Sequence, residues 1–236
     1  DLHSFPTRRS SDLVGVKNPA SLDIELGADI TLTAAIPVSL DAKIQGNGKK
    51  LTAGGARHFE VQSTAGGGPT FTGVTFDGAS TGGGVSVLSG GKATFEGGAF
   101  ENNRSAATGG AVSVASGGEV TFNGTAFTGN QATSNGGAVS VTGTGKATFS
   151  GTIAFSKNTA TGNGGAVHLE GAAAEFPSSV SFENNTAANG GAVALSDAVN
   201  SKATFNGNTL SPNTATANGG SLYIPGNATE IGRAHV

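Results

Sequence analysis

Side chains that could carry acid–base chemistry are sparse in this chain. Asp77 and Glu101 follow phenylalanines at matching places in the sequence, and Arg104 is the nearest basic residue. Paired carboxylates are the machinery of glycoside hydrolases, whereas acidic residues that hold calcium, with a Lys or Arg as base, serve polysaccharide lyases. The other charged residues are scattered, so we expect two solvated carboxylates here and no catalytic residue.

Arg57 and His58 form the other local cluster of polar side chains, which we interpret as a surface turn. The stretch "GNGKKL" at 46–51 starts like a dinucleotide-binding loop but lacks the third glycine, so it predicts a turn. The chain has no Cys, and its glycine pairs lack the Asp that calcium-binding β-rolls need. We therefore expect no bound metal and no cofactor.

The charge of the chain argues against a nucleic-acid partner. Lys and Arg number 13 against 16 Asp and Glu, the formal net charge is -3, and no basic residues cluster. The 40 glycines recur on a period with apolar residues between them, which favours a folded repeat over disorder. We also expect no membrane insertion within this chain.

A short phrase built on two glycines recurs along the sequence and suggests its architecture. The phrase "NGGAVSV" stands at 135–141, and its first glycine has equivalents at 82, 109, 136, 164, 190 and 219, a period near 27 residues. A second phrase, such as "ATF" at 93–95, and a third, such as "FENN" at 100–103, keep the same phase. Each phrase is long enough for a short strand and too short for a helix.

Three short strands in about 27 residues indicate a solenoid in which each period makes one turn, or rung. A propeller blade would need about 40–45 residues, and the Leu spacing of a leucine-rich repeat is missing. The sequence therefore predicts an all-β, three-faced parallel β-helix whose equivalent strands stack about 4.8 Å apart.

Stacked rungs place like residues in columns. Because side chains alternate along a strand, we expect Val112 and Val114 to point inward and Ser113 to point outward. The outward column would continue through Ser86, Ser140, His168, Ala194 and Tyr223. A second outward column, of Thr residues flanked by Lys92, Glu119, Lys146 and Lys202, is interpreted as ordinary surface.

Two further sets of residues should form ladders through the stack. The inward phenylalanines predict two core ladders, one of Phe95, Phe122, Phe149, Phe176 and Phe205, the other of Phe100, Phe127, Phe155 and Phe182. The corner after the second phenylalanine carries Asn103, Asn130, Asn158, Asn185 and Asn213, which predict an asparagine ladder. Asn side chains satisfy backbone groups at bends and can bond to one another.

The parts of the chain differ in how regularly the repeat is kept, and they are not separate domains. Residues 1–13 and 230–236 resemble translated sequencing adapters, so we expect both ends to be artefacts of sequence assembly. Residues 14–70 are interpreted as less regular N-terminal rungs, because terminal repeats of solenoids are often atypical. Residues 71–229 are interpreted as the regular β-helix repeats.

The alternation of Gly-Gly-Ala-Val with Phe-x-x-Asn over residues 76–222 resembles the polymorphic outer membrane protein repeats of autotransporter-type bacterial surface proteins. Four intact copies of each motif carry the resemblance. It implies a right-handed β-helix, found extracellularly or on the outer-membrane surface, that takes part in adhesion. Its partner would be a host or environmental surface receptor or glycan.

We therefore expect a non-catalytic extracellular β-helix passenger or stalk of a bacterial surface protein, with an adhesive role. The alternative is a fragment of a β-helical polysaccharide lyase or glycoside hydrolase, because this fold by itself implies no function.

Overall fold

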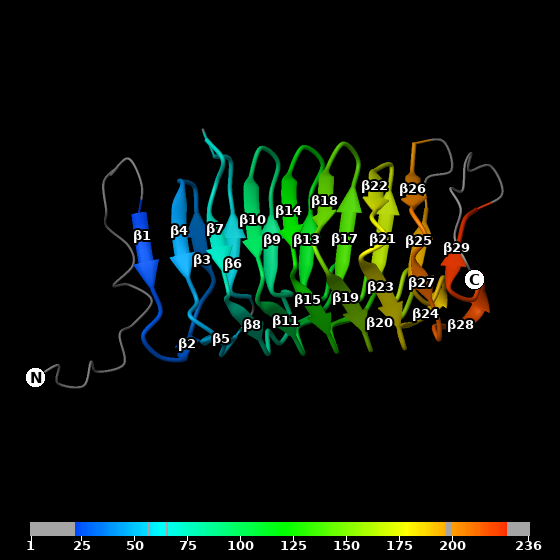
Figure 1. Cartoon of the computed structure of the whole chain (residues 1–236), viewed down its shortest axis with the longest axis horizontal. Coiled ribbons are helices and arrows are strands. Elements are labelled where there is room, and N and C mark those ends of the chain that lie inside the picture. Colours follow the sequence, from blue (N-terminus) through cyan, green and yellow to red (C-terminus); the bar gives the residue numbers. More distant parts are fainter. Residues whose placement is uncertain (1–21, 56, 65, 197–199, 226–236) are drawn as a thin grey trace, which may run out of the picture.

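Short β-strands stacked into a solenoid make up the described structure (Figure 1). The computed structural model describes residues 22–55, 57–64, 66–196 and 200–225. Within these ranges there are 29 β-strands and no helix. The adapter-like ends predicted at 1–13 and 230–236 lie outside the described residues, as do 14–21 and 226–229 of the predicted rungs.

Three parallel sheets of eight strands each run the length of the stack. Sheet A consists of β1 (Leu22–Glu25), β4 (Ala42–Gln45), β7 (Thr70–Thr72), β10 (Lys92–Glu96), β14 (Glu119–Asn123), β18 (Lys146–Ser150), β22 (Ala173–Phe176) and β26 (Lys202–Phe205). Sheet B consists of β2 (Ile30–Leu32), β5 (Lys50–Ala53), β8 (Thr75–Asp77), β11 (Ala99–Glu101), β15 (Ala126–Thr128), β19 (Ile153–Ser156), β23 (Val180–Glu183) and β27 (Thr209–Leu210). Sheet C consists of β3 (Ile36–Val38), β6 (Phe59–Val61), β9 (Val85–Val87), β13 (Val112–Val114), β17 (Val139–Thr142), β21 (Val167–Glu170), β25 (Val193–Leu195) and β29 (Leu222–Tyr223).

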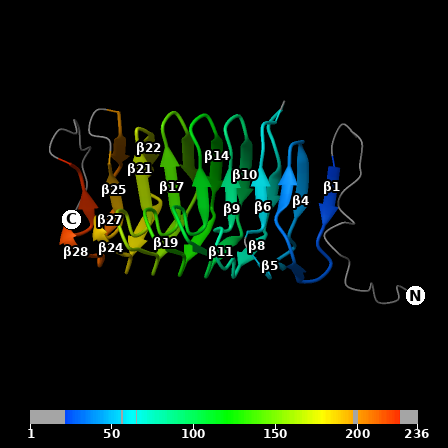
Figure 2. The same cartoon turned by 180° about the vertical axis from the view of Figure 1, so that it is seen from behind.

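A fourth, smaller sheet joins the stack from β12 onward. Sheet D consists of β12 (Arg104–Ser105), β16 (Gln131–Ala132), β20 (Thr159–Ala160), β24 (Thr186–Asn189) and β28 (Thr214–Asn218). The chain runs from sheet A to B, then D, then C in each regular rung, and the view from behind shows the strands in the same order along the stack (Figure 2). The predicted parallel β-helix with three main sheets is thus confirmed, and sheet D is a feature that the sequence did not predict.

The registers pair equivalent residues of successive rungs. Thr121 of β14 pairs with Thr94 of β10 and Thr148 of β18, and Phe127 of β15 pairs with Phe100 of β11. At the predicted boundary between less regular and regular rungs near residue 70, β7 pairs with β4 before it and β10 after it. The less regular and the regular rungs therefore belong to one continuous stack.

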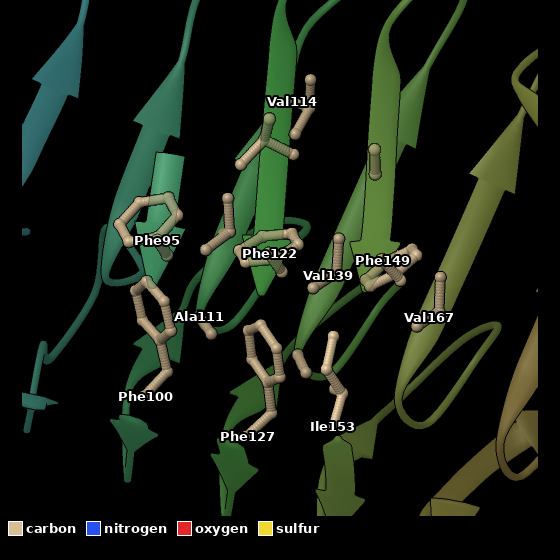
Figure 3. Packing of buried hydrophobic residues seen from close by; sticks show 14 of the residues in the cluster. Phe95, Phe100, Ala111, Val114, Phe122, Phe127, Val139, Phe149, Ile153 and Val167 are labelled. Carbon is tan, nitrogen blue, oxygen red and sulfur yellow. The ribbon is translucent and has the colours of Figure 1, made fainter. Parts of the chain in front are cut away.

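The core consists of columns of identical side chains. The rings of Phe100 and Phe127 stack at 5.3 Å with an interplanar angle of 3°, and those of Phe127 and Phe155 at 4.6 Å and 10°. The column of Phe122 meets this one edge-on, with the Phe122 and Phe127 rings 5.0 Å apart at 83° (Figure 3). These rings are at most 1% exposed, so each rung buries its neighbours' aromatic faces.

The two glycines of the repeated phrase have separate roles. Gly136 adopts a φ of 65°, which favours glycine. A Cβ on Gly137 would lie 2.1 Å from the Gly165 carbonyl oxygen of the next rung, a distance that no real Cβ tolerates. The phrase therefore recurs because every rung must make the same turn and the same close approach.

The residue before four of the five ladder asparagines, all but Asn213, also has a left-handed backbone. The φ values are 54° at Asn102, 68° at Gly129, 57° at Lys157 and 58° at Asn184. Asn and Gly suit this region, whereas Lys157 adopts it at a conformational cost. The corner geometry is thus imposed by the stack, and one rung keeps it despite an unfavourable residue.

The structure corrects the expectation that the column of Ser113 faces solvent. Ser140 is 1% exposed, and His168 and Ala194 are fully buried. The cause is the glycine turn, which folds back over the outer face of its own strand: a Cβ on Gly136 would lie 3.0 Å from the Ser140 Cβ. The backbone of the turn therefore covers these side chains.

Candidate functional site

The most concentrated charged cluster lies on the outer face of sheet B. Glu101 of β11 pairs in register with Asp77 of β8, so their carboxylates project from adjacent rungs. Lys50 of β5, one rung earlier, places its Nζ 2.8 Å from Glu101 Oε2 and 3.5 Å from Asp77 Oδ2. Asn102 Nδ2 donates to Asp77 Oδ1 at 3.1 Å. Two carboxylates and one lysine thus form a connected surface network.

Lys50, not Arg104, is the basic partner of this carboxylate pair. The hydrogen bond that Lys50 donates to Glu101 and the charges of both carboxylates raise the pKa of the Lys50 ammonium, which keeps it a cation. Arg104 instead begins β12 in sheet D. The earlier rung supplies the lysine, and that rung belongs to the part of the chain where the repeat is hardest to recognise.

A second polar cluster surrounds His168 on β21. Its Nε2 lies 2.5 Å from Ser196 Oγ and its Nδ1 lies 3.5 Å from Ser140 Oγ. Asn163 Nδ2 donates to Ser196 Oγ at 3.5 Å. Burial lowers the pKa of the His168 imidazole to about 4, so it is neutral near pH 7. A neutral imidazole can donate a hydrogen bond to one serine hydroxyl and accept one from the other.

We expect His168 to make the fold acid-sensitive. The unfolded chain binds a proton at this residue near pH 6.5, whereas the folded chain does so only near pH 4. The stability that neutral His168 contributes is therefore present above pH 6.5 and is lost as the pH falls toward 4, by about 3 kcal/mol in all. Urea unfolding between pH 7 and 4 should show this slope.

His168→Ser provides the matched control, because serine occupies the same column at Ser113 and Ser140. The difference in unfolding free energy between wild type and this variant should shrink as the pH falls. A constant difference across this range would show that His168 does not titrate as its burial requires.

His58 also departs from the sequence expectation of a surface turn, since it is fully buried. Its Nε2 lies 2.7 Å from the Leu51 carbonyl oxygen and 3.2 Å from that of Asp77, so Nε2 carries the proton and donates. Burial lowers the pKa of His58, opposed by its backbone hydrogen bonds. Arg57 remains at the surface, with its Nη1 3.7 Å from Glu60 Oε2. The cluster predicted here is therefore split, and His58 is a core residue.

The asparagines predicted for the corner form a continuous hydrogen-bonded ladder, which is buried except at Asn213. Asn130 Nδ2 donates to Asn158 Oδ1 at 2.9 Å and to the Phe100 carbonyl oxygen at 3.0 Å. Asn130 Oδ1 accepts from both the backbone N–H and the Nδ2 of Asn103. The same contacts link Asn158 to Asn185 and Asn185 to Asn213. These residues are structural, since the ladder consumes their hydrogen-bonding groups.

A second asparagine ladder, which the sequence analysis missed, runs along the glycine turns. Asn163 N–H donates to Asn135 Oδ1 at 2.8 Å. The Nδ2 of Asn189 donates to Asn163 Oδ1 at 2.9 Å, and that of Asn218 to Asn189 Oδ1 at 2.8 Å. The signal was present in the sequence as an Asn directly before the glycine pair. This ladder is more exposed than the corner ladder and stabilises the turn that covers sheet C.

The described residues include two hollows on the outer surface that bear on function. One, of about 590 Å³, follows sheet D and is lined mainly by Thr and Ala side chains. The other, of about 650 Å³, lies over β18, β22 and β26 of sheet A, between Lys146 and Lys202. Over the part of the chain that the structure describes, no three His, Asp or Glu side chains gather as metal ligands. Those residues also include no helix that could cross a membrane.

The stacked parallel strands define a β-solenoid protein, and comparison with known families identifies which kind of solenoid it is. The family described as right-handed β-helix region matches residues 60–231. The chain therefore belongs to the right-handed β-helix family. No curated protein and no solved structure matches it.

Proposed function

We propose that this chain is a non-catalytic extracellular β-helix passenger or stalk of a bacterial surface protein, with an adhesive role. In this view it belongs among the polymorphic outer membrane protein repeats of autotransporter-type proteins. Its partner is a receptor or glycan on a host or environmental surface.

The observation that carries the proposal is the uniform stack itself. Two asparagine ladders and two phenylalanine ladders repeat the same contacts rung after rung, which produces a rigid rod. Each rung contacts mainly its neighbours, as in other solenoids, and the outward residues recur in register along the rod. A regular extended surface of this kind suits display and multivalent contact.

The alternative is a β-helical polysaccharide lyase or glycoside hydrolase, and the Lys50–Asp77–Glu101 network favours it. Three adjacent rungs bring two carboxylates and a lysine together on one outer face. Lys50, however, already pairs with both carboxylates. A working acid and base must be free to reach the substrate within hydrogen-bond distance.

Incubation with pectin, alginate and glycosaminoglycans, with and without calcium, tests the choice. We expect no new reducing or unsaturated ends. Beads coated with the protein should instead attach to cells or to immobilised glycans, and bare beads should not. Cleavage that disappears in Asp77→Asn or Glu101→Gln would establish the enzyme and overturn the proposal.

A further inference from the structure

The hollow of about 590 Å³ over sheet D follows the axis of the stack across several rungs. Its lining includes residues of β12, β16, β20 and β24, and these strands pair with one another in that order. Three rung spacings of about 4.8 Å separate the first of these strands from the fourth, so the hollow extends over roughly 14 Å between them. A ligand that fills it must therefore be elongated.

The side chains along one outward column of the hollow change from charged to uncharged. On successive rungs, the register aligns Arg104, Gln131, Thr159 and Thr186. The first three residues are exposed, and Thr186 is half-buried. The column thus offers a cation at one end and a carboxamide and hydroxyl groups along the rest.

Arg104 supplies the charge of the hollow. No other charged side chain lines it among the described residues, and within them the Arg104 guanidinium has no hydrogen bond or ion pair. The carboxylates of Asp77 and Glu101 contact Lys50 instead. A guanidinium without a partner can bind a carboxylate through two parallel N–H···O bonds. This end of the hollow therefore favours a ligand that carries a carboxylate.

The rungs beyond Arg104 supply hydroxyl and methyl groups. Thr133, Thr159 and Thr186 stand on three successive rungs, and their hydroxyls make no hydrogen bond within the part of the chain that the structure describes. The spacing of about 4.8 Å from rung to rung is close to the length of one sugar in an extended glycan. Ala160 and Ala187 add apolar surface, against which the C–H face of a sugar can pack. This part of the hollow therefore favours uncharged sugars.

We propose that the hollow over sheet D binds a glycan that ends in an acidic sugar, with the carboxylate at Arg104 and neutral sugars along the threonines of the following rungs. This deepens the proposed adhesive function and rests on it for its biological role. The bond between carboxylate and guanidinium sets the direction in which the glycan lies. Gln131, one rung further, can both donate to and accept from the hydroxyls of the acidic sugar.

Other elongated ligands match the hollow less well. A polyanion such as a nucleic acid or a polyuronate carries a charge at every repeat, whereas one guanidinium lines this hollow. A peptide that binds a sheet usually adds a strand at a free edge, but β16 and β20 are already paired on both sides. A glycan with a single terminal carboxylate matches both the lone cation and the uncharged rungs.

Isothermal titration calorimetry on the whole chain tests the class of ligand. The probes are two trisaccharides that end in sialic acid and in glucuronic acid, neutral lactose, and trigalacturonate, which is acidic at every sugar. We expect at least one acid-ended trisaccharide to bind about tenfold more tightly than lactose or trigalacturonate, with an advantage over lactose that salt reduces. Absence of binding by both trisaccharides, or equal binding of lactose or trigalacturonate, would overturn the proposal.

Variants of exposed residues locate the site. Arg104→Gln should weaken binding of the acid-ended trisaccharide about tenfold and leave lactose unaffected, because one charge-assisted contact is lost. Arg104→Lys keeps the charge but not the planar fork, so its loss should be intermediate. Lys43→Gln, on β4 of sheet A and outside the lining of the hollow, is the charge-matched control and should bind as wild type. Unchanged binding in Arg104→Gln would refute the placement of the carboxylate.

Thr159→Glu tests the path of the neutral sugars. It places a carboxylate in the middle of the hollow, which repels the acidic ligand and fills its space, so binding should be abolished. Thr159→Ser keeps a hydroxyl at the same place and should retain binding. Equal melting temperatures of these variants and wild type show that they fold alike. Full binding by a folded Thr159→Glu variant would sink the proposal.

Attachment of coated beads separates this site from the proposed function. Beads that attach equally with wild type and Thr159→Glu would leave adhesion standing and refute the hollow as its contact. Binding of an acid-ended trisaccharide by a protein whose beads never attach would support the hollow and refute adhesion.

Discussion

Phe127→Ala is expected to lower the free energy of unfolding by about 3–5 kcal/mol. Phe127 is fully buried, and its ring stacks on Phe100 and Phe155 and meets Phe122 edge-on. Truncation removes all three ring contacts at once and leaves a cavity that neighbouring rungs cannot fill without disturbing their own registers. Chemical denaturation followed by circular dichroism measures the loss.

Phe127→Leu is the matched control, because leucine already occupies this column at Leu51 and Leu210. It keeps an apolar group in the same place and should cost much less than alanine. A loss below about 0.5 kcal/mol in Phe127→Ala, the size typical of surface substitutions, would mean that the column does not support the fold.

Asn130→Ala is expected to be about as damaging, at roughly 4 kcal/mol, although it removes no apolar surface. The variant loses two bonds that Asn130 Oδ1 accepts from Asn103 and two that its Nδ2 donates. The Asn103 N–H and the Phe100 carbonyl would then remain buried without these partners. Buried polar groups of this kind cost about 1–3 kcal/mol each.

Asn213→Ala tests whether position in the ladder matters. Asn213 accepts from Asn185 and donates to the Phe182 carbonyl, but it is only half-buried and stands in the last described rung of the ladder. Water can replace part of what is lost there, so the cost should be clearly smaller than at Asn130. Equal losses at both positions would show that burial does not set the energy of this ladder.

The architecture could be predicted because the period is written directly in the sequence. Once the phrases recur every 27 or so residues, equivalent residues must stack, and the pairing of Thr94 with Thr121 follows without knowledge of any contact. Sheet D was not predictable in the same way. Its first strands are only two residues long, such as Arg104–Ser105, and show no alternation of apolar and polar residues.

The errors about side-chain exposure share one physical cause. Alternation along a strand assigns each residue to a face, but it does not say what covers that face. Ser140 and His168 do point away from the core, yet the glycine turn of their own rung lies over them. His58 is buried for a similar reason, because backbone carbonyls from neighbouring strands surround it.

Only part of the network of Lys50, Asp77 and Glu101 could be predicted from the sequence. Asp77 and Glu101 follow equivalent phenylalanines, so their pairing on adjacent rungs could be foreseen. Lys50 stands in a stretch without the repeated phrases, and its long side chain reaches across two rungs. Sequence spacing gives the position of a backbone but not the reach of a flexible side chain.

The direction of the hydrogen bonds between rungs has a mechanical consequence. These bonds run along the axis of the stack, so a pull on its two ends loads them in tension rather than in shear. Only the bonds of the outermost rung resist at any moment, because each rung is attached to its immediate neighbour. Each failure would free roughly 90 Å of chain, the extended length of one period. The rod would thus lengthen in equal increments under load. Each rung that unfolds lowers the tension, and the remaining rungs stay folded.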